Sequence, residues 1–298
     1  MNKWWWLLLI VLLWAALGFA IFGFQPAQKA SAAPLPGEVN RIVSTAPSLT
    51  EILFAIGLGE KIVGVSNYSD YPPEAAKKKK VGTFWQPNVE AVIAAKPDLV
   101  ITLGFSQQKN LAERLRRIGY NSLTLNIKKI SELFDAIETI GTATDMRVEA
   151  KALVSGMRGE LRNLSASAAT EKKVRVLFVV QREPLRVVGR QTFVNEMIEL
   201  AGGENAIGPT LHKYPPIGAE QVIACGADVI IESAMTGQDL AKQKDKAIQY
   251  WSRFKNVPAV RNGRIYVIDG DTVSRLGPRL CEGASAIARC LRPGLFAR

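Results

Sequence analysis

The chain contains the same short pattern twice, once in each half. In the first copy, Glu90 opens a short apolar segment and Asp98 precedes a run of branched residues, 99–102. In the second copy, Glu220 and Asp228 hold the same two positions before another branched run. A repeated helix–strand unit predicts two related α/β lobes, and small-molecule sites often lie in a cleft between two lobes. The alternative is a common helix–strand unit that recurs by chance.

A second similarity supports the repeat. Thr50 and Glu51 are followed by two glycines, and Asn195 and Glu196 are followed by two glycines at similar spacing. The 298 residues are enough for two domains of roughly 100–150 residues each.

Strand-like and helix-like segments alternate in the first half, which is typical of βα units around a mostly parallel sheet. The predicted strands are 41–45, 61–65, 98–103 and 122–125. The predicted helices begin at Pro47, near residue 89 and near residue 107. Ser48 and Glu51 have the spacing of a capping box at the first of these helices.

A long helical segment follows. Residues 130–169 are predicted to be helical throughout, because apolar residues recur there at steps of three and four, at Met146, Ala150, Leu153, Met157, Leu161 and Leu164. A helix of about 20 residues spans roughly 30 Å, which is long enough to link two lobes. A second series of strands and helices begins with the predicted strand 174–180 and includes the predicted strand 264–268.

The predicted fold class is therefore α/β, with two βα lobes that each contain a central, mostly parallel sheet and with a long rigid helix that joins them. The predicted divisions are a signal peptide or N-terminal membrane anchor at 1–32, a linker at 33–40, an N-terminal α/β lobe at 41–143, the connecting helix at 144–169 and a C-terminal α/β lobe at 170–298.

The N-terminus has the features of an export signal. Residues 4–24 are continuously apolar after Lys3, and the small residues 30–32 precede a proline-rich stretch. The apolar run is also long enough to cross a bilayer, so cleavage and retention as an anchor are both open. Because no cysteine lies near the end of this segment, we expect no lipoprotein anchor. Both alternatives predict a periplasmic or otherwise extracytoplasmic protein.

The charge of the chain is strongly positive. A formal net charge of +11 suits nucleic acid, an anionic membrane or an anionic ligand. Export and the absence of aromatic residues among the basic ones argue against nucleic acid. We interpret the densest basic run, Lys77–Lys80, as a solvated helix end.

The sequence lacks the motifs of common enzyme classes. It contains no serine nucleophile elbow, no histidine pair and no glycine-rich phosphate loop, and His212 is its only histidine. The cysteines Cys225, Cys281 and Cys290 do not have metal-ligand spacing, and they are either three free thiols or include one disulfide through Cys225. We therefore expect no catalytic residues, no metal site and no resident cofactor.

Several segments closely resemble the periplasmic cobalamin-binding proteins. The resemblance is carried by RIVSTAPSLTE at 41–51, VSNYSDYPPE at 65–74, VGTFWQPNVE at 81–90 and KPDLV at 96–100. It covers essentially all of residues 40–295 and is weaker in the second half. Those proteins are helix-linked substrate-binding proteins of ABC importers, so the resemblance implies the class III periplasmic binding protein fold. Siderophore-binding and haem-binding proteins share much of this framework.

The resemblance also implies a ligand site. Tyr68, Trp85 and Tyr214 would form its aromatic walls, which suits the broad and mostly apolar corrin ring. The segment after the last predicted strand would add further contacts, from Asp271, Thr272, Val273, Ser274 and Arg275. The structural alternatives are that Phe84 or Trp85 plugs the loop against its own lobe, and that Asp271 prepares a helix start.

Glu90 and Glu220 are predicted to bind a membrane permease. In the resembled family, the matching glutamates dock onto arginines of the permease dimer, and opposite charges orient such encounters. The alternative is that each carboxylate only interacts favourably with the dipole of its own helix.

Five further residues allow more than one kind of ligand. Arg182, Arg186 and Arg190 follow the strand at 174–180, and they suit either an anionic ligand or a solvated edge. His212 is either a surface residue or a neighbour of a bound metal. Tyr71 resembles the position of an iron-ligating tyrosine in haem-binding relatives.

The sequence thus predicts an exported, monomeric binding protein, not an enzyme, that captures cobalamin or a related corrinoid and delivers it to an ABC permease dimer, with no nucleic-acid partner. A haem-binding or iron-siderophore-binding protein of the same fold is the alternative. An enzyme that acts on the chelate through Asp70 and Asp271 and a membrane-tethered sensor are weaker alternatives.

Overall fold

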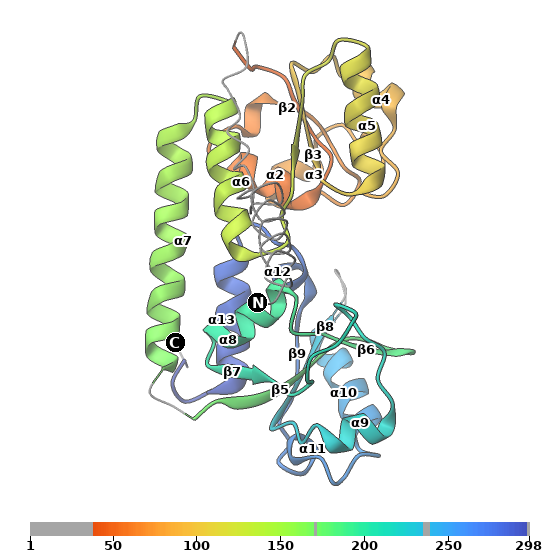
Figure 1. Cartoon of the computed structure of the whole chain (residues 1–298), viewed down its shortest axis with the longest axis vertical. Helices are drawn as coiled ribbons and strands as arrows, with labels where there is room; N and C mark the ends of the chain where they lie inside the picture. Colours follow the sequence, from red (N-terminus) through yellow and green to blue (C-terminus); the bar gives the residue numbers. More distant parts are fainter. Residues whose placement is uncertain (1–37, 170–171, 235–238, 297–298) are drawn as a thin grey trace, which may run out of the picture. The chain divides into compact units, whose positions relative to one another are not determined.

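The computed structural model describes residues 38–169, 172–234 and 239–296 (Figure 1). The predicted signal or anchor, 1–32, lies outside these residues, as does most of the predicted linker. None of the helices within the described ranges has both the length and the hydropathy of a membrane span.

The first half folds around a four-stranded sheet in which every pair is parallel, in the order β2-β1-β3-β4. Its strands are β1 (Ile42–Ser44), β2 (Ile62–Val65), β3 (Leu99–Leu103) and β4 (Ser122–Leu125). Its helices are α2 (Pro47–Ala55), the 3₁₀ turn η1 (Gly59–Lys61), α3 (Pro73–Ala76), α4 (Val89–Ala94) and α5 (Ser106–Arg117). The strands consist largely of buried branched residues, as expected of a parallel sheet that is covered on both faces.

The second half folds around a five-stranded sheet in the order β6-β5-β8-β9, with β7 also paired to β5. All pairs are parallel except β5 with β6. Its strands are β5 (Val174–Arg182), β6 (Leu185–Val187), β7 (Gly203–Asn205), β8 (Val229–Ala234) and β9 (Ile265–Asp269). Its helices are α8 (Phe193–Leu200), α9 (Ala219–Ala224), α10 (Leu240–Trp251), α11 (Pro258–Arg261), α12 (Gly270–Ser274) and α13 (Leu280–Leu291).

The sequence repeat corresponds to a structural repeat. Asp98 Oδ2 accepts a hydrogen bond of 2.9 Å from the backbone N–H of Arg41 at the start of β1, and Asp228 Oδ2 accepts one of 3.0 Å from the backbone N–H of Arg175 at the start of β5. The guanidinium groups of Arg41 and Arg175 donate to carbonyl oxygens at the ends of α4 and α9. Chance recurrence of a helix–strand unit would not reproduce these contacts, so the predicted repeat is confirmed.

The predicted capping box at the start of α2 is wrong. Ala46 is the N-cap of this helix and provides no side-chain hydrogen bond. Pro47 occupies the first turn, where the N–H that proline lacks would have no helical partner. Glu51 instead takes part in ion pairs with a distant part of the chain.

Residues 130–169, which were predicted to be helical throughout, form two helices with a short turn between them. The segment forms α6 (Ile130–Ala143) and α7 (Arg147–Ala168), and Asp145 between them has a φ of +60°. Aspartate tolerates this left-handed conformation better than most residues, which allows the chain to turn here. A Cβ atom at Gly141 would collide with the Cβ atom of Ala150, so glycine allows α6 and α7 to pack closely.

The helix α7 contacts elements of both halves of the chain. It packs against α6, α8 and α13, and α6 and α7 lie side by side in Figure 1. Its buried face, from Ala150 to Leu161, belongs to one hydrophobic cluster that includes Ile42 of β1 and Val176 of β5. The predicted α/β class, with two sheets and a long helix between them in the chain, is confirmed.

Candidate functional site

A hollow of about 300 Å³ brings together three of the residues that were predicted to contact a ligand. Tyr214, Val273 and Ser274 line it, together with Phe178, Val180, Val194 and Ser233. Burial raises the pKa of the Tyr214 hydroxyl, so the ring stays uncharged at neutral pH. The hollow therefore offers a mostly apolar wall with a few hydroxyl groups, which is the usual chemistry of a small-molecule site.

Two hydrogen bonds position the walls of this hollow. The carbonyl of Lys213 accepts a 2.8 Å hydrogen bond from the N–H of Gly189, and a Cβ at Gly189 would lie 2.9 Å from that oxygen. This contact holds the loop that carries Tyr214 near the end of β6. Asp269 caps α12 by accepting a 3.0 Å hydrogen bond from the N–H of Asp271, which fixes the helix that carries Val273.

Trp85 rests on an aromatic cluster and does not line the hollow around Tyr214. Its ring meets Phe84 edge to face, with 4.8 Å between ring centroids, and lies 5.5 Å from the ring of Phe105. Phe84 packs against the main core, whereas Trp85 is 63% exposed. Phe84 thus plugs the loop, and the Trp85 ring faces solvent.

The sequence did not reveal how the Trp85 loop is held. Gln108 is fully buried, and its Nε2 donates 3.0 Å hydrogen bonds to the carbonyl oxygens of Phe84 and Thr45. Its Oε1 accepts from the N–H of Leu103 at 2.7 Å and from the hydroxyl of Thr45 at 2.7 Å. Nothing in the sequence distinguishes this glutamine from its exposed neighbour Gln107.

Tyr68 lies on the loop after β2, is 64% exposed and does not line the hollow either. The next residue, Ser69, is buried, and its hydroxyl oxygen lies 2.8 Å from that of Ser66 and accepts a 3.1 Å bond from Thr50. These contacts fix the loop and leave the Tyr68 ring in solvent. The predicted roles of Tyr68 and Trp85 in ligand binding remain predictions.

Two of the other predicted ligand contacts belong to an ion-pair network that we call the arginine cluster, made up of Glu51, Asp70, Asp271, Arg275 and Arg279. Arg279 binds Glu51 through two hydrogen bonds of 2.7 and 3.1 Å. Arg275 lies 2.8 Å from Asp70, 3.0 Å from Asp271 and 3.5 Å from Glu51. The cluster connects α2 and the β2–α3 loop to α12 and the residues after it.

The charges of the arginine cluster stabilise one another. Burial opposes the charge of Asp70, but the hydrogen bond from Arg275 and its positive charge outweigh it, so the pKa of Asp70 lies below its usual value. Burial also disfavours charged Arg275 and Arg279, but the pKa of each is raised by hydrogen bonds to Asp70 and Glu51, respectively. Arg275 and Asp271 thus have protein partners already. Thr272 donates to the carbonyl of Asp269 at 3.1 Å.

The three arginines that suggested an anionic ligand have different environments. Arg182 forms an ion pair of 2.6 Å with the buried Glu232. Arg186 donates to the carbonyl of Tyr214, and Arg190 donates to the carbonyls of Asn205 and Ile207. They therefore help to hold loops of the second half in place. Arg186 and Arg190 are also exposed, and Arg186 lies on the edge strand β6, which agrees with the solvated-edge alternative.

Glu90 and Glu220 are exposed on the first turns of the matching helices α4 and α9. Glu90 lies 3.8 Å from Arg114, and both side chains are largely exposed. The positions agree with a role in docking, and their function remains a prediction.

His212 is exposed, and its carbonyl accepts a 2.8 Å hydrogen bond from Thr210. Within the described ranges, no group of three or more histidine, cysteine, aspartate or glutamate side chains is placed to hold a metal ion. All three cysteines are buried free thiols, which decides against the disulfide alternative. Burial raises the pKa of Cys281 to about 12 and that of Cys290 to about 11, so both thiols stay protonated at neutral pH.

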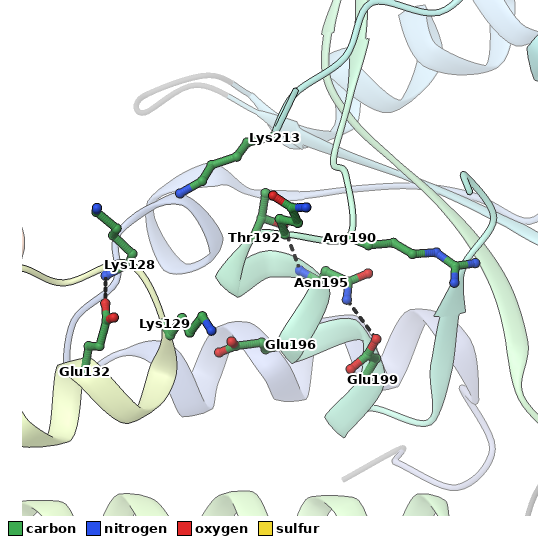
Figure 2. A pocket seen from close by; sticks show the side chains of 10 residues that line it. Lys128, Lys129, Glu132, Arg190, Thr192, Asn195, Glu196, Glu199 and Lys213 are labelled. Atoms are coloured by element: carbon green, nitrogen blue, oxygen red, sulfur yellow. Dashed lines mark hydrogen bonds between the residues drawn. The ribbon is translucent and has the colours of Figure 1, made fainter. Parts of the chain in front are cut away.

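A second pocket, of about 470 Å³, was not predicted (Figure 2). Lys128 and Lys129 line it from the loop before α6, Lys213 lines it from the loop of Tyr214, and Asn195 lines it from α8. Lys128 and Lys129 follow a strand, which is a usual place for a binding residue in α/β proteins. Their proximity to Lys213 and Asn195, far away in the chain, has no signal in the sequence.

The periplasmic binding protein family matches residues 42–272 of this chain. The chain is 33% identical to the uncharacterised ABC transporter substrate-binding lipoprotein YvrC of Bacillus subtilis, over 87% of this chain and 82% of that protein. It is 30% identical to the vitamin B12-binding protein of Vibrio parahaemolyticus, over 84% of this chain and 91% of that protein.

Two solved structures have similar folds. The periplasmic vitamin B12-binding protein BtuF of Vibrio cholerae matches with a TM-score of 0.73 and 28% identity, over 87% of this chain and 98% of that one. The periplasmic haem-binding protein RhuT of Roseiflexus matches with a TM-score of 0.74 and 25% identity, over 87% of this chain and 100% of that one.

Proposed function

Because this chain belongs to the periplasmic binding protein family, we propose that it is the extracytoplasmic substrate-binding protein of an ABC importer and that it binds cobalamin or a related corrinoid. It delivers this ligand to a permease dimer in the membrane, acts as a monomer and binds no nucleic acid. Its N-terminal segment, 1–32, is an export signal or an anchor, and the first cysteine of the chain, Cys225, is too distant to carry an N-terminal lipid. Its role is binding, not catalysis.

The observation that carries this proposal is the hollow around Tyr214. Its mostly apolar lining, which includes two aromatic rings, suits a broad and mostly apolar corrin ring, and relatives named for vitamin B12 align with most of the chain. Tyr68 and Trp85 add two exposed aromatic rings from the first half, and α12 adds Asp271 and Thr272. Arg275 reaches the ligand while it keeps its ion pairs.

The permease binds through Glu90 and Glu220. Both carboxylates are exposed at the starts of equivalent short helices, one in each half of the repeat. A permease dimer with matching basic sites would therefore meet the same kind of group twice, and opposite charges would orient the complex.

Haem is the second candidate ligand. Tyr71 is 43% exposed and the guanidinium carbon of Arg279 lies 4.1 Å from the centroid of its ring. An accessible tyrosine is a known type of haem-iron ligand, and the haem-binding protein RhuT has a similar fold.

An absorption spectrum tests the proposal. The purified protein is incubated with cobalamin, cobinamide, haem or a ferric siderophore and then passed over a gel-filtration column. We expect a cobalt-corrin spectrum in the protein fraction, and we expect Trp85→Ala to raise the Kd for the corrinoid on the order of ten-fold by calorimetry. Val148→Ala, which shortens an exposed side chain on α7, is the matched control. A haem Soret band without corrinoid absorption would replace the first candidate with the second.

A further inference from the structure

The second pocket contains more positive than negative side chains. Figure 2 shows the ammonium groups of Lys128 and Lys213 on one side of it and the guanidinium group of Arg190 on the other. With Lys129, the pocket has four basic side chains and three acidic ones, Glu132, Glu196 and Glu199.

The acidic side chains of this pocket are engaged in holding its walls. Glu132 accepts a 2.7 Å hydrogen bond from the N–H of Lys128, and Glu196 accepts one of 2.8 Å from the N–H of Ile130. Glu199 accepts a 2.8 Å bond from the side-chain amide of Asn195. The carboxylates therefore fix the loop before α6 and the side of α8.

The ammonium groups of the three lysines, in contrast, are not bound to other described parts of the protein. Within the described residues, Lys128, Lys129 and Lys213 form no ion pair, and none of their ammonium groups donates a hydrogen bond to the protein. Arg190, in contrast, is committed to the carbonyls of Asn205 and Ile207. Three ammonium groups can thus donate hydrogen bonds to a group that enters the pocket, whose charged side chains sum to a net charge of +1.

Asn195 gives a second and independent indication. It is 3% exposed, and its Oδ1 is the buried side-chain acceptor that has no hydrogen-bond partner within the described structure. Thr50 holds the matching position in the first half of the repeat, and its hydroxyl contacts Ser44 at 2.8 Å and Ser69 at 3.1 Å. An unpaired buried acceptor is costly, so this one favours a ligand that brings an N–H donor.

The pocket adjoins the hollow of the proposed ligand site. Lys213 and Asn195 line the pocket. Their neighbours in the chain, Tyr214 and Val194, line the hollow. One ligand can therefore place an apolar ring against Tyr214 and a polar extension among the lysines.

We propose that this pocket binds an oxyanion of the transported ligand beside an N–H donor of the same ligand. The inference rests on the proposed function and specifies it. In a complete corrinoid the oxyanion is the phosphodiester that carries the nucleotide, and the donor is a neighbouring side-chain amide. Cobinamide lacks the phosphodiester and leaves the lysines unpaired.

The test is a comparison of two variants with two ligands. Calorimetry measures the Kd of cobalamin and of dicyanocobinamide for the wild type, for Lys128→Gln/Lys213→Gln and for Lys151→Gln, which removes an exposed lysine of α7 outside the pocket. The double variant should raise the Kd of cobalamin about ten-fold or more, because charge-assisted hydrogen bonds are lost, and should leave the Kd of cobinamide within about two-fold. The affinity of the wild type for cobalamin should also fall more steeply with salt than that of the double variant.

Each other outcome has a definite meaning. The oxyanion pocket would be overturned if the double variant lost equal affinity for both corrinoids or kept its full affinity for cobalamin. It would also be overturned if Lys151→Gln lost as much affinity as the double variant. Corrinoid binding itself would stand in each case. If the wild type binds neither corrinoid, the proposed function fails first. If the wild type binds haem and the double variant weakens it, the propionate carboxylates are the oxyanions and the phosphodiester assignment is overturned.

Discussion

Glu51 is the most buried carboxylate of the arginine cluster, with a side chain that is 2% exposed. Arg279 and Arg275 approach it at 2.7 and 3.5 Å, and both of these side chains are also largely buried. A buried ion pair contributes little net stability by itself, but removal of one partner leaves uncompensated charge in the interior.

We therefore expect Glu51→Gln to lower the free energy of unfolding by about 2–4 kcal/mol, because it leaves two arginines with one carboxylate fewer. Urea unfolding at neutral pH, followed by circular dichroism, measures this change. Glu113→Gln on the exposed face of α5 is the control and should change the free energy of unfolding by less than about 0.5 kcal/mol. Equal stability of Glu51→Gln and the wild type would mean that the arginine cluster is not needed for the fold.

At the scale of elements, the junction of α6 and α7 depends on a glycine. The two helices approach so closely that a methyl group at Gly141 would collide with Ala150. Gly156, in the same pair of helices, has open space where its Cβ would be.

Replacement of glycine by alanine should therefore change the free energy of unfolding in opposite directions at these two positions. Gly141→Ala should lower the free energy of unfolding by about 1–3 kcal/mol through overpacking, despite the better helix propensity of alanine. Gly156→Ala should raise it by about 0.5–1 kcal/mol, since only the propensity changes. Thermal and urea unfolding of both variants measure these shifts. A stabilised Gly141→Ala protein would show that the helices can separate at little cost.

At the scale of the whole molecule, transport requires both ligand binding and docking, and charge reversal separates the two. Glu90→Arg with Glu220→Arg should reduce ligand uptake by cells at least ten-fold, because two like charges would then face the basic permease sites. The Kd for the ligand should stay unchanged, since both side chains are exposed and lie outside the hollow.

Glu149→Arg, on the exposed first turn of α7, is the matched control for charge reversal. Uptake by the cells should remain normal with this variant. Docking through Glu90 and Glu220 would be excluded if their double reversal left uptake intact.

Local patterns made much of the fold predictable from the sequence. The branched strands and the spacing of Glu90 to Asp98 and of Glu220 to Asp228 concern residues that are close in the chain, so the repeat could be recognised before its contacts were known. The family resemblance likewise depended on contiguous segments, and the family match confirms it.

The sequence analysis failed where contacts between residues far apart in the chain determine the role of a side chain. Glu51 has the spacing of a capping residue, but Arg279, 228 residues away, determines its role. The lysines of the second pocket come from two loops that only the fold brings together.

The contact between Glu51 and Arg279 also has a kinetic consequence. A pair so far apart in the chain can form only after most of the intervening polypeptide is ordered, because closing that loop earlier costs much entropy. We therefore expect its energy to be gained after the rate-limiting step of folding. On this expectation, Glu51→Gln speeds unfolding and leaves the folding rate nearly unchanged in stopped-flow measurements.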